Sequence, residues 1–80
     1  MSAQITVYVK TESQCRPCEA TIRKLKSSGY VEGIDYTEVS AEDNLYKLKE
    51  LGMFEAPVVM VNGHEPWSGY RPDLIEDIVL

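Results

Sequence analysis

The sequence predicts a single α/β domain over residues 1–80, in which a four-stranded mixed sheet is flanked by three helices in the order βαβαββα. Eighty residues, 44% of them hydrophobic, supply one small core and leave no room for a second. Strand and helix patterns alternate in the first half of the chain, which is typical of a β-α-β unit with parallel strands and a right-handed crossover. Near the end, Asn62-Gly63 between an apolar run and a short returning strand indicates an antiparallel hairpin.

The first strand is expected over residues 5–9, because ITVYV is β-branched, aromatic and almost entirely apolar, as in a strand buried on both faces. A helix should begin near Cys15. Cys18, Ile22 and Leu25 then fall at i, i+4 and i+7 on one helix face, with charged residues on the other faces. Gly29 is the expected end of this helix.

The next two elements are a strand over residues 34–39 and a helix over residues 40–52. IDYTEV alternates apolar and polar residues, as a half-buried strand does. The helix has Ser40 as its N-cap, acidic residues in its first turn and Gly52 as its C-cap. Three leucines share one stripe of it: Leu45, Leu48 and Leu51.

The last part of the chain predicts two strands and a helix. APVVMV is a continuous apolar run of central-strand type, and the Asn-Gly pair favours a type I′ turn into a short strand, HEPW. Pro66 places that strand at an edge of the sheet. Pro72 suits the first turn of a final helix in RPDLIEDIVL.

The charge balance excludes some classes of function. Thirteen acidic and eight basic residues give a net charge of -5, which argues against the positive field needed for binding nucleic acid. No apolar run approaches the ~18 residues of a membrane span, and the first ten residues lack the pattern of a signal peptide. We therefore expect a cytoplasmic monomer with no membrane or nucleic-acid partner.

The chain contains two cysteines, Cys15 and Cys18, separated by Arg16 and Pro17. At the start of a helix, free backbone N–H groups and the positive end of the helix dipole stabilise a thiolate, so Cys15 should have the lower pKa. Cys18 shares the apolar face and should be shielded. This division of labour suits a redox pair in which Cys15 attacks a substrate disulfide and Cys18 resolves the mixed disulfide.

Two other uses of the pair stay open at this point. A closed zinc site needs more ligands than two cysteines and the single His64 provide, although two chains could share an iron-sulfur cluster. A purely structural disulfide over so short a loop would constrain little of the unfolded chain. A metal-binding or cluster-carrying module is therefore the alternative from a different functional class.

Beyond the cysteines, the segment WSGYRPD (residues 67–73) makes the resemblance to a family specific. Together with Cys-x-x-Cys and APVV, it resembles the NrdH-redoxins, which have a thioredoxin-like fold and the size of a glutaredoxin. That resemblance implies a protein disulfide oxidoreductase with no bound cofactor, which takes electrons from NADPH through thioredoxin reductase. It further implies the class Ib ribonucleotide reductase large subunit as the recipient. The runner-up within this class is a glutathione-dependent glutaredoxin.

The resemblance also implies the residues that contact substrate. Pro57 would be a cis-proline facing the cysteines, with Ala56 offering its backbone to the substrate. The remaining expected substrate contacts are Arg16, Pro17, Trp67, Ser68, Gly69 and Tyr70. The sequence departs from the family in the loop KTESQC, where a Lys-Pro-x-Cys pattern is usual, and in the Arg16-Pro17 pair between the cysteines.

Overall fold

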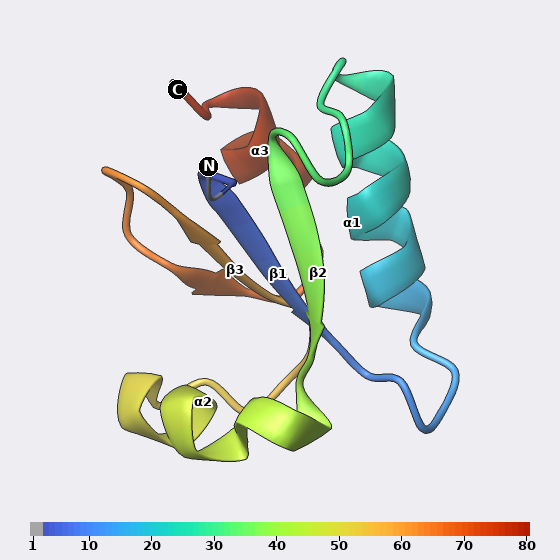
Figure 1. The fold of residues 1–80 in the computed structure, drawn as a ribbon, viewed down its shortest axis with the longest axis vertical. Helices are drawn as coiled ribbons and strands as arrows, with labels where there is room; N and C mark the ends of the chain where they lie inside the picture. Colours follow the sequence, from blue (N-terminus) through green and yellow to red (C-terminus); the bar gives the residue numbers. More distant parts are fainter. Residues whose placement is uncertain (1–2) are drawn as a thin grey trace.

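A four-stranded mixed sheet forms the centre of the computed structural model, which describes residues 3–80 (Figure 1). The strands are β1 (Ile5–Val9), β2 (Tyr36–Ser40), β3 (Val58–Val61) and β4 (Trp67–Ser68), in the order β2-β1-β3-β4. The helices are α1 (Arg16–Ser27), η1 (Glu42–Asn44, a 3₁₀ turn), α2 (Leu45–Leu51) and α3 (Pro72–Glu76). β1 runs parallel to β2 and antiparallel to β3, and β3 is antiparallel to β4. The predicted mixed sheet, its element order and the edge position of the last strand are therefore confirmed.

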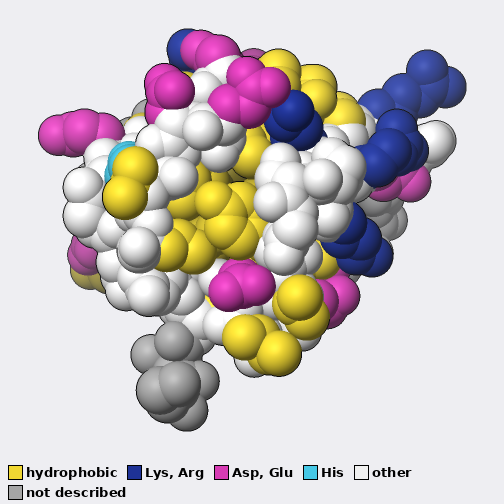
Figure 2. Space-filling view, turned by 90° about the horizontal axis from the view of Figure 1, so that it is seen from above, with side chains coloured by type: hydrophobic (Ala, Val, Ile, Leu, Met, Phe, Trp, Pro, Cys, Tyr) yellow, Lys and Arg dark blue, Asp and Glu magenta, His cyan; other side chains and the backbone are white. Residues whose placement is uncertain are grey.

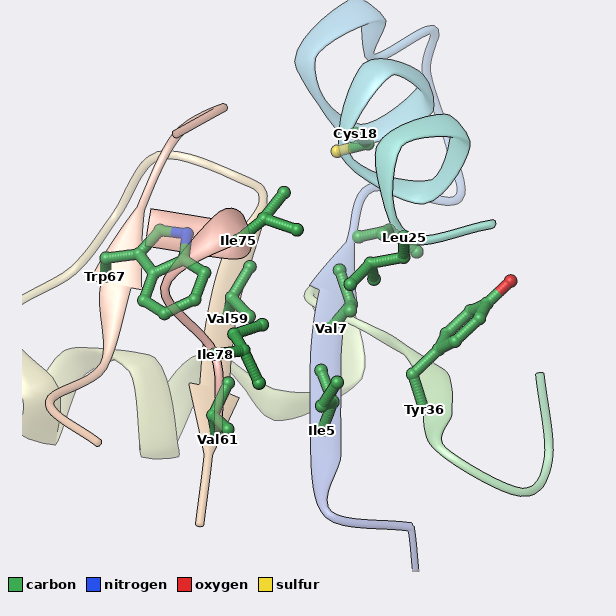
Figure 3. Close-up of a cluster of buried hydrophobic side chains, with 11 residues drawn as sticks. Ile5, Val7, Cys18, Leu25, Tyr36, Val59, Val61, Trp67, Ile75 and Ile78 are labelled. Carbon is green, nitrogen blue, oxygen red and sulfur yellow. The ribbon is translucent and has the colours of Figure 1, made fainter. Parts of the chain in front are cut away.

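The sheet is covered on both faces, as the apolar β1 sequence predicts. Val7 and Tyr8 are neighbours in β1 but belong to different buried clusters, because successive side chains of a strand point to opposite faces. On the Val7 face, α1 contributes Leu25 and α3 contributes Ile75 to the larger cluster (Figure 3). On the Tyr8 face, Leu48 of α2 packs in the smaller cluster.

The helix α1 ends just before Gly29, the residue that the sequence predicts as its end. Gly29 has a φ of 93°, and the amide of Tyr30 donates to the carbonyl of Leu25 at 3.1 Å. The amide of Gly29 donates to the carbonyl of Lys26 at 3.1 Å. This pair of hydrogen bonds is a Schellman cap, which requires the left-handed backbone that glycine adopts without steric cost.

The predicted start of the second strand is wrong by two residues, because residues 31–35 form a tight turn. The amide of Asp35 donates to the carbonyl of Val31 at 2.8 Å, and the Asp35 carboxylate accepts from the amide of Val31 at 2.8 Å. Ile34 is therefore 71% exposed and lies outside β2.

The single helix predicted over residues 40–52 is interrupted. Ser40 does act as a cap, since its hydroxyl accepts from the amide of Asp43 at 3.1 Å. Asn44 donates its side-chain amide to the carbonyl of Ser40 at 2.7 Å and has a non-helical φ of -126°, so a 3₁₀ turn precedes α2. Leu45 is consequently 62% exposed, while the predicted C-cap, Gly52, is confirmed by its φ of 70°.

The hairpin after β3 also differs from its prediction. The amide of His64 donates to the carbonyl of Val61 at 3.0 Å, and positive φ occurs at Gly63 but not at Asn62. That combination defines a type II turn, whereas a type I′ turn needs positive φ at both central residues. The last strand is shorter than the predicted HEPW and begins later, at Trp67. Pro66, which has no backbone N–H to donate, lies just before it.

Candidate active site

Cys15 occupies the N-cap of α1, where its backbone is extended, with φ -136° and ψ 94°. Its sulfur accepts a hydrogen bond from the amide of Cys18 at 3.3 Å, and its carbonyl accepts one from the amide of Glu19 at 3.1 Å. The sulfur thus lies at the positive end of a 12-residue helix, beside a backbone N–H that has no partner within the helix. Both features stabilise the negative charge of a thiolate.

Cys18 is the shielded member of the pair, as its helix register predicts. It is 4% exposed and belongs to the buried cluster on the Val7 face of the sheet. Figure 3 shows its side chain leaving α1 on the side of that cluster. The two sulfurs are joined in a disulfide, with a Cα–Cα distance of 5.2 Å. The structure therefore holds the oxidised form of a pair with one accessible and one buried sulfur.

The loop before β3 comes close to the accessible sulfur. The Ala56-Pro57 peptide bond is cis, as the family resemblance implies, and the Pro57 side chain is fully buried. The carbonyl oxygen of Ala56 lies 3.9 Å from Cys15 Sγ, although the two residues are 41 positions apart in the sequence.

The last residue of β4 and the residue after it form hydrogen bonds to the same loop. The amide of Gly69 donates to the carbonyl of Pro57 at 2.8 Å, and the hydroxyl of Ser68 donates to the carbonyl of Glu55. Gly69 has a φ of 85°, a backbone conformation that an L side chain rarely adopts. Ser68 and Gly69 therefore hold the proline loop through hydrogen bonds, which connects the WSG segment to the loop that lies near Cys15.

Trp67 has a different position from that expected of an exposed substrate contact. It is 6% exposed and packs in the main core, where Figure 3 shows its indole extending from β4 beside Val59 and Ile75. Its Nε1 is buried and has no hydrogen-bond partner within residues 3–80. Trp67 is thus a core residue at the start of this segment. Tyr70, 40% exposed, is the accessible aromatic residue of the segment.

The two residues between the cysteines are both exposed. Arg16 and Pro17 occupy the first two positions of α1, where a missing proline N–H leaves no helical hydrogen bond unmade. The carbonyl of Pro17 accepts a hydrogen bond from the Thr21 hydroxyl at 2.8 Å. Their exposure next to Cys15 leaves both side chains available to an incoming substrate.

A residue that the sequence did not single out for the site, Glu42, anchors the loop leading to Cys15. Its carboxylate accepts hydrogen bonds from the Thr11 amide at 3.0 and 3.2 Å, from the Thr11 hydroxyl at 3.1 Å and from the Glu12 amide at 3.2 Å. These bonds, with that from the Thr11 amide as the largest cause, lower the pKa of Glu42 to about 2. No local sequence pattern could have found the contact, since Glu42 also fits the acidic first turn expected of a helix.

Within residues 3–80, no three histidine, cysteine or acidic side chains lie together as a possible metal site. None of the helices described is both long and apolar enough to cross a membrane.

The sequence of this chain is similar to a known family and to several known proteins. The family model described as glutaredoxin matches residues 5–65. The Gene 56 protein of Mycobacterium phage L5 is 35% identical over 79 residues, covering 96% of this chain and 73% of the relative. The glutaredoxin-like protein NrdH of Salmonella typhimurium is 36% identical over 74 residues, covering 89% and 83%.

A solved structure extends the likeness to three dimensions. The glutaredoxin-like protein NrdH-redoxin from Escherichia coli matches with a TM-score of 0.78 and 29% identity, covering 95% of each chain. This chain therefore has the thioredoxin-like fold, with the four-stranded mixed sheet and the helices described above. The chain therefore belongs to the glutaredoxin family and, within it, to the NrdH-redoxins, which are thiol-disulfide oxidoreductases.

Proposed function

We propose that this protein is a dithiol electron carrier that receives electrons from NADPH through thioredoxin reductase and reduces a protein disulfide. The client we propose is the large subunit of class Ib ribonucleotide reductase. The observation that carries the proposal is the partly exposed Cys15 at the N-terminus of α1, with its proposed resolving partner Cys18 buried. The relative from E. coli, described as having a thioredoxin-like activity profile, supports the choice of reductase.

The reaction follows from the different positions of the two sulfurs. In the reduced protein, the Cys15 thiolate attacks one sulfur of the client disulfide, which forms a mixed disulfide and releases the other client sulfur as a thiol after protonation. Cys18 then loses its proton and attacks Cys15 Sγ. This second exchange forms the Cys15–Cys18 disulfide and releases the second client thiol, so two electrons pass to the client. The reductase supplies two electrons to restore the dithiol.

The proposed substrate site lies where the cis-proline loop comes close to Cys15. A substrate whose sulfur reaches Cys15 also meets the backbone of Ala56, because that carbonyl lies 3.9 Å from Cys15 Sγ. Tyr70 is the exposed aromatic residue of the segment that braces this loop. These groups favour an extended peptide, which can pair with the backbone and place an apolar side chain against an aromatic ring.

The charge in this region also favours a protein over glutathione as the partner. Arg71 is the cation of the segment over residues 67–73, and it donates to Asp73 through Nε at 3.1 Å and through a terminal nitrogen at 2.9 Å. The hydrogen bonding to Asp73 and the negative charge of its carboxylate both raise the pKa of Arg71. A guanidinium held in this two-point pair has fewer donors left for a carboxylate of the tripeptide.

A coupled assay tests the choice of electron source. NADPH consumption is followed with insulin as the disulfide substrate, with either thioredoxin reductase or glutathione plus glutathione reductase as the electron supply. We expect turnover in the thioredoxin reductase arm. Turnover confined to the glutathione arm would show instead a glutathione-dependent glutaredoxin.

A second measurement tests the client. Purified class Ib ribonucleotide reductase large subunit, oxidised beforehand, is mixed with the reduced protein, and free thiols are counted on each chain after separation. We expect two new thiols on the large subunit for each carrier molecule oxidised. The Cys15→Ser variant is the control, and thiols gained equally in its presence would contradict the proposal.

A further inference from the structure

A groove of about 490 Å³ opens beside both cysteines, on the side of α1 away from the cis-proline loop. Cys15 and Cys18 form one part of its wall. Its charged lining comes from α1, from β2 and from the residue after β1: Lys10, Glu19, Arg23, Lys26 and Glu38. The reaction described above uses the two cysteines of this wall, whereas the charged side chains of the groove take no part in it or in the proposed substrate site.

The three cations of the groove are available for a partner. Within residues 3–80, the ion pairs are Lys24–Glu76 and Arg71–Asp73, neither of which involves a residue of the groove. Burial and the neighbouring Glu32 raise the pKa of Glu38, while the positive charge of Lys26 lowers it, so part of the Lys26 charge is compensated.

The charge of the groove contrasts with that of the whole chain. The side chains of the groove other than the cysteines, three cations against two carboxylates, carry one net positive charge, in a protein whose net charge is -5. The positive end of α1 adds to it. Figure 2 shows lysine and arginine side chains gathered on the right of the view, the side on which α1 lies in Figure 1.

We propose that this groove binds an acidic segment of the protein whose disulfide is reduced, and so selects clients with Asp or Glu near the reacting cysteine. The inference rests on the disulfide-reducing function proposed above and adds the chemistry of the client. The argument for this occupant is charge complementarity: a carboxylate placed among Lys10, Arg23 and Lys26 meets three cations, of which Glu38 compensates only Lys26 in part, whereas a basic segment is repelled by them.

The length of α1 gives the spacing between the acidic residues and the reacting cysteine. At 1.5 Å per residue, Arg23 lies about 12 Å and Lys26 about 16 Å along the helix from Cys15. An extended peptide covers about 3.3 Å per residue, so the acidic residues should lie about four to five positions from the client cysteine.

Peptide substrates test this inference without any reductase. Three peptides share an internal Cys-x-x-Cys disulfide and differ at the fourth and fifth positions from the attacked cysteine, which are Glu-Glu, Gln-Gln or Lys-Lys. The protein is reduced with dithiothreitol and desalted, and the second-order rate of peptide reduction is measured by stopped flow. At low ionic strength we expect about a tenfold faster reaction for the Glu peptide than for the Gln peptide. The difference should disappear at about 0.5 M salt, where the Debye length is shorter than the groove.

Charge-reversed variants locate the effect. The double variant Arg23→Glu, Lys26→Glu should invert the preference, so that the Lys peptide reacts fastest. The matched control, Lys47→Glu, Lys49→Glu on α2, has the same net charge and should keep the preference for the Glu peptide. Circular dichroism checks the fold, and Arg23→Gln, Lys26→Gln replaces the first variant if it is unfolded.

The outcomes separate this inference from the proposed function. Equal rates for the three peptides, or the same change in both double variants, would overturn the acidic-client groove even if the protein turns over with thioredoxin reductase. A preference for the Glu peptide that is lost in the groove variant would support the groove even if thioredoxin reductase proves not to be the electron source.

Discussion

Replacing Trp67 with phenylalanine should leave the free energy of unfolding within about 1.5 kcal/mol of the wild-type value, whereas alanine should lower it by about 3–5 kcal/mol. Trp67 is 6% exposed and packs in the main core, so truncation to alanine leaves a large cavity. A domain of this size has a total stability of only about 4–12 kcal/mol. Trp67→Ala should therefore be marginally folded or unfolded.

The phenylalanine variant differs because two effects of similar size oppose each other. Phenylalanine lacks two carbons and the nitrogen of the indole, which lowers the stability by about 1.6 kcal/mol at 0.8 kcal/mol for each buried carbon. The substitution also removes the buried Nε1, which has no hydrogen-bond partner within residues 3–80. Burying such a donor costs about 1–3 kcal/mol, so its removal offsets the lost packing.

Guanidinium unfolding followed by far-ultraviolet circular dichroism measures both variants, since Trp67 is the only tryptophan and its fluorescence is lost with it. Insulin reduction by the chemically reduced variant is measured alongside. If Trp67→Phe lowered the free energy of unfolding by more than about 3 kcal/mol, removal of the buried Nε1 would not offset the lost packing, and the reasoning would be wrong. A stable Trp67→Phe variant with strongly reduced activity would instead show that the indole contacts the substrate, as the family resemblance implies.

Three further predictions concern the cysteines, the loop before them and the core. Cys15→Ser should abolish disulfide reduction, while Cys18→Ser should accumulate a mixed disulfide detectable by mass spectrometry; full activity of Cys15→Ser would reverse the assigned roles. Because the pKa of Glu42 is about 2 in the folded protein and ordinarily 4.5, its anchoring of the loop should be present above about pH 4.5 and lost as the pH falls toward 2. Glu42→Gln should loosen that loop already at pH 7, and unchanged amide-exchange protection there would contradict this anchoring. Leu25→Ala should lower the stability by about 2–5 kcal/mol in urea unfolding, against less than about 0.5 kcal/mol for Leu45→Ala, and equal losses would contradict the two burial assignments.

The sequence by itself determined those features that depend on residues only a few positions apart. Cys15 begins a helix and Cys18 points inward because helix register is a local property, and Gly29 and Gly52 end helices because a left-handed backbone favours glycine. The same local rules were wrong over residues 40–45, where the Asn44 side chain bonded to the Ser40 carbonyl and replaced a helical turn.

Only the tertiary structure decided what surrounds the sulfur of Cys15. The carbonyl of Ala56 comes to it from 41 positions away, and Glu42 holds the preceding loop from 31 positions away. The sequence pattern of WSGYRPD predicted a segment close to the cysteines, but it did not show that Trp67 turns into the core while Tyr70 stays exposed. The physical reason is that side-chain direction in an irregular segment depends on which distant surface it packs against, and no short-range periodicity records that surface.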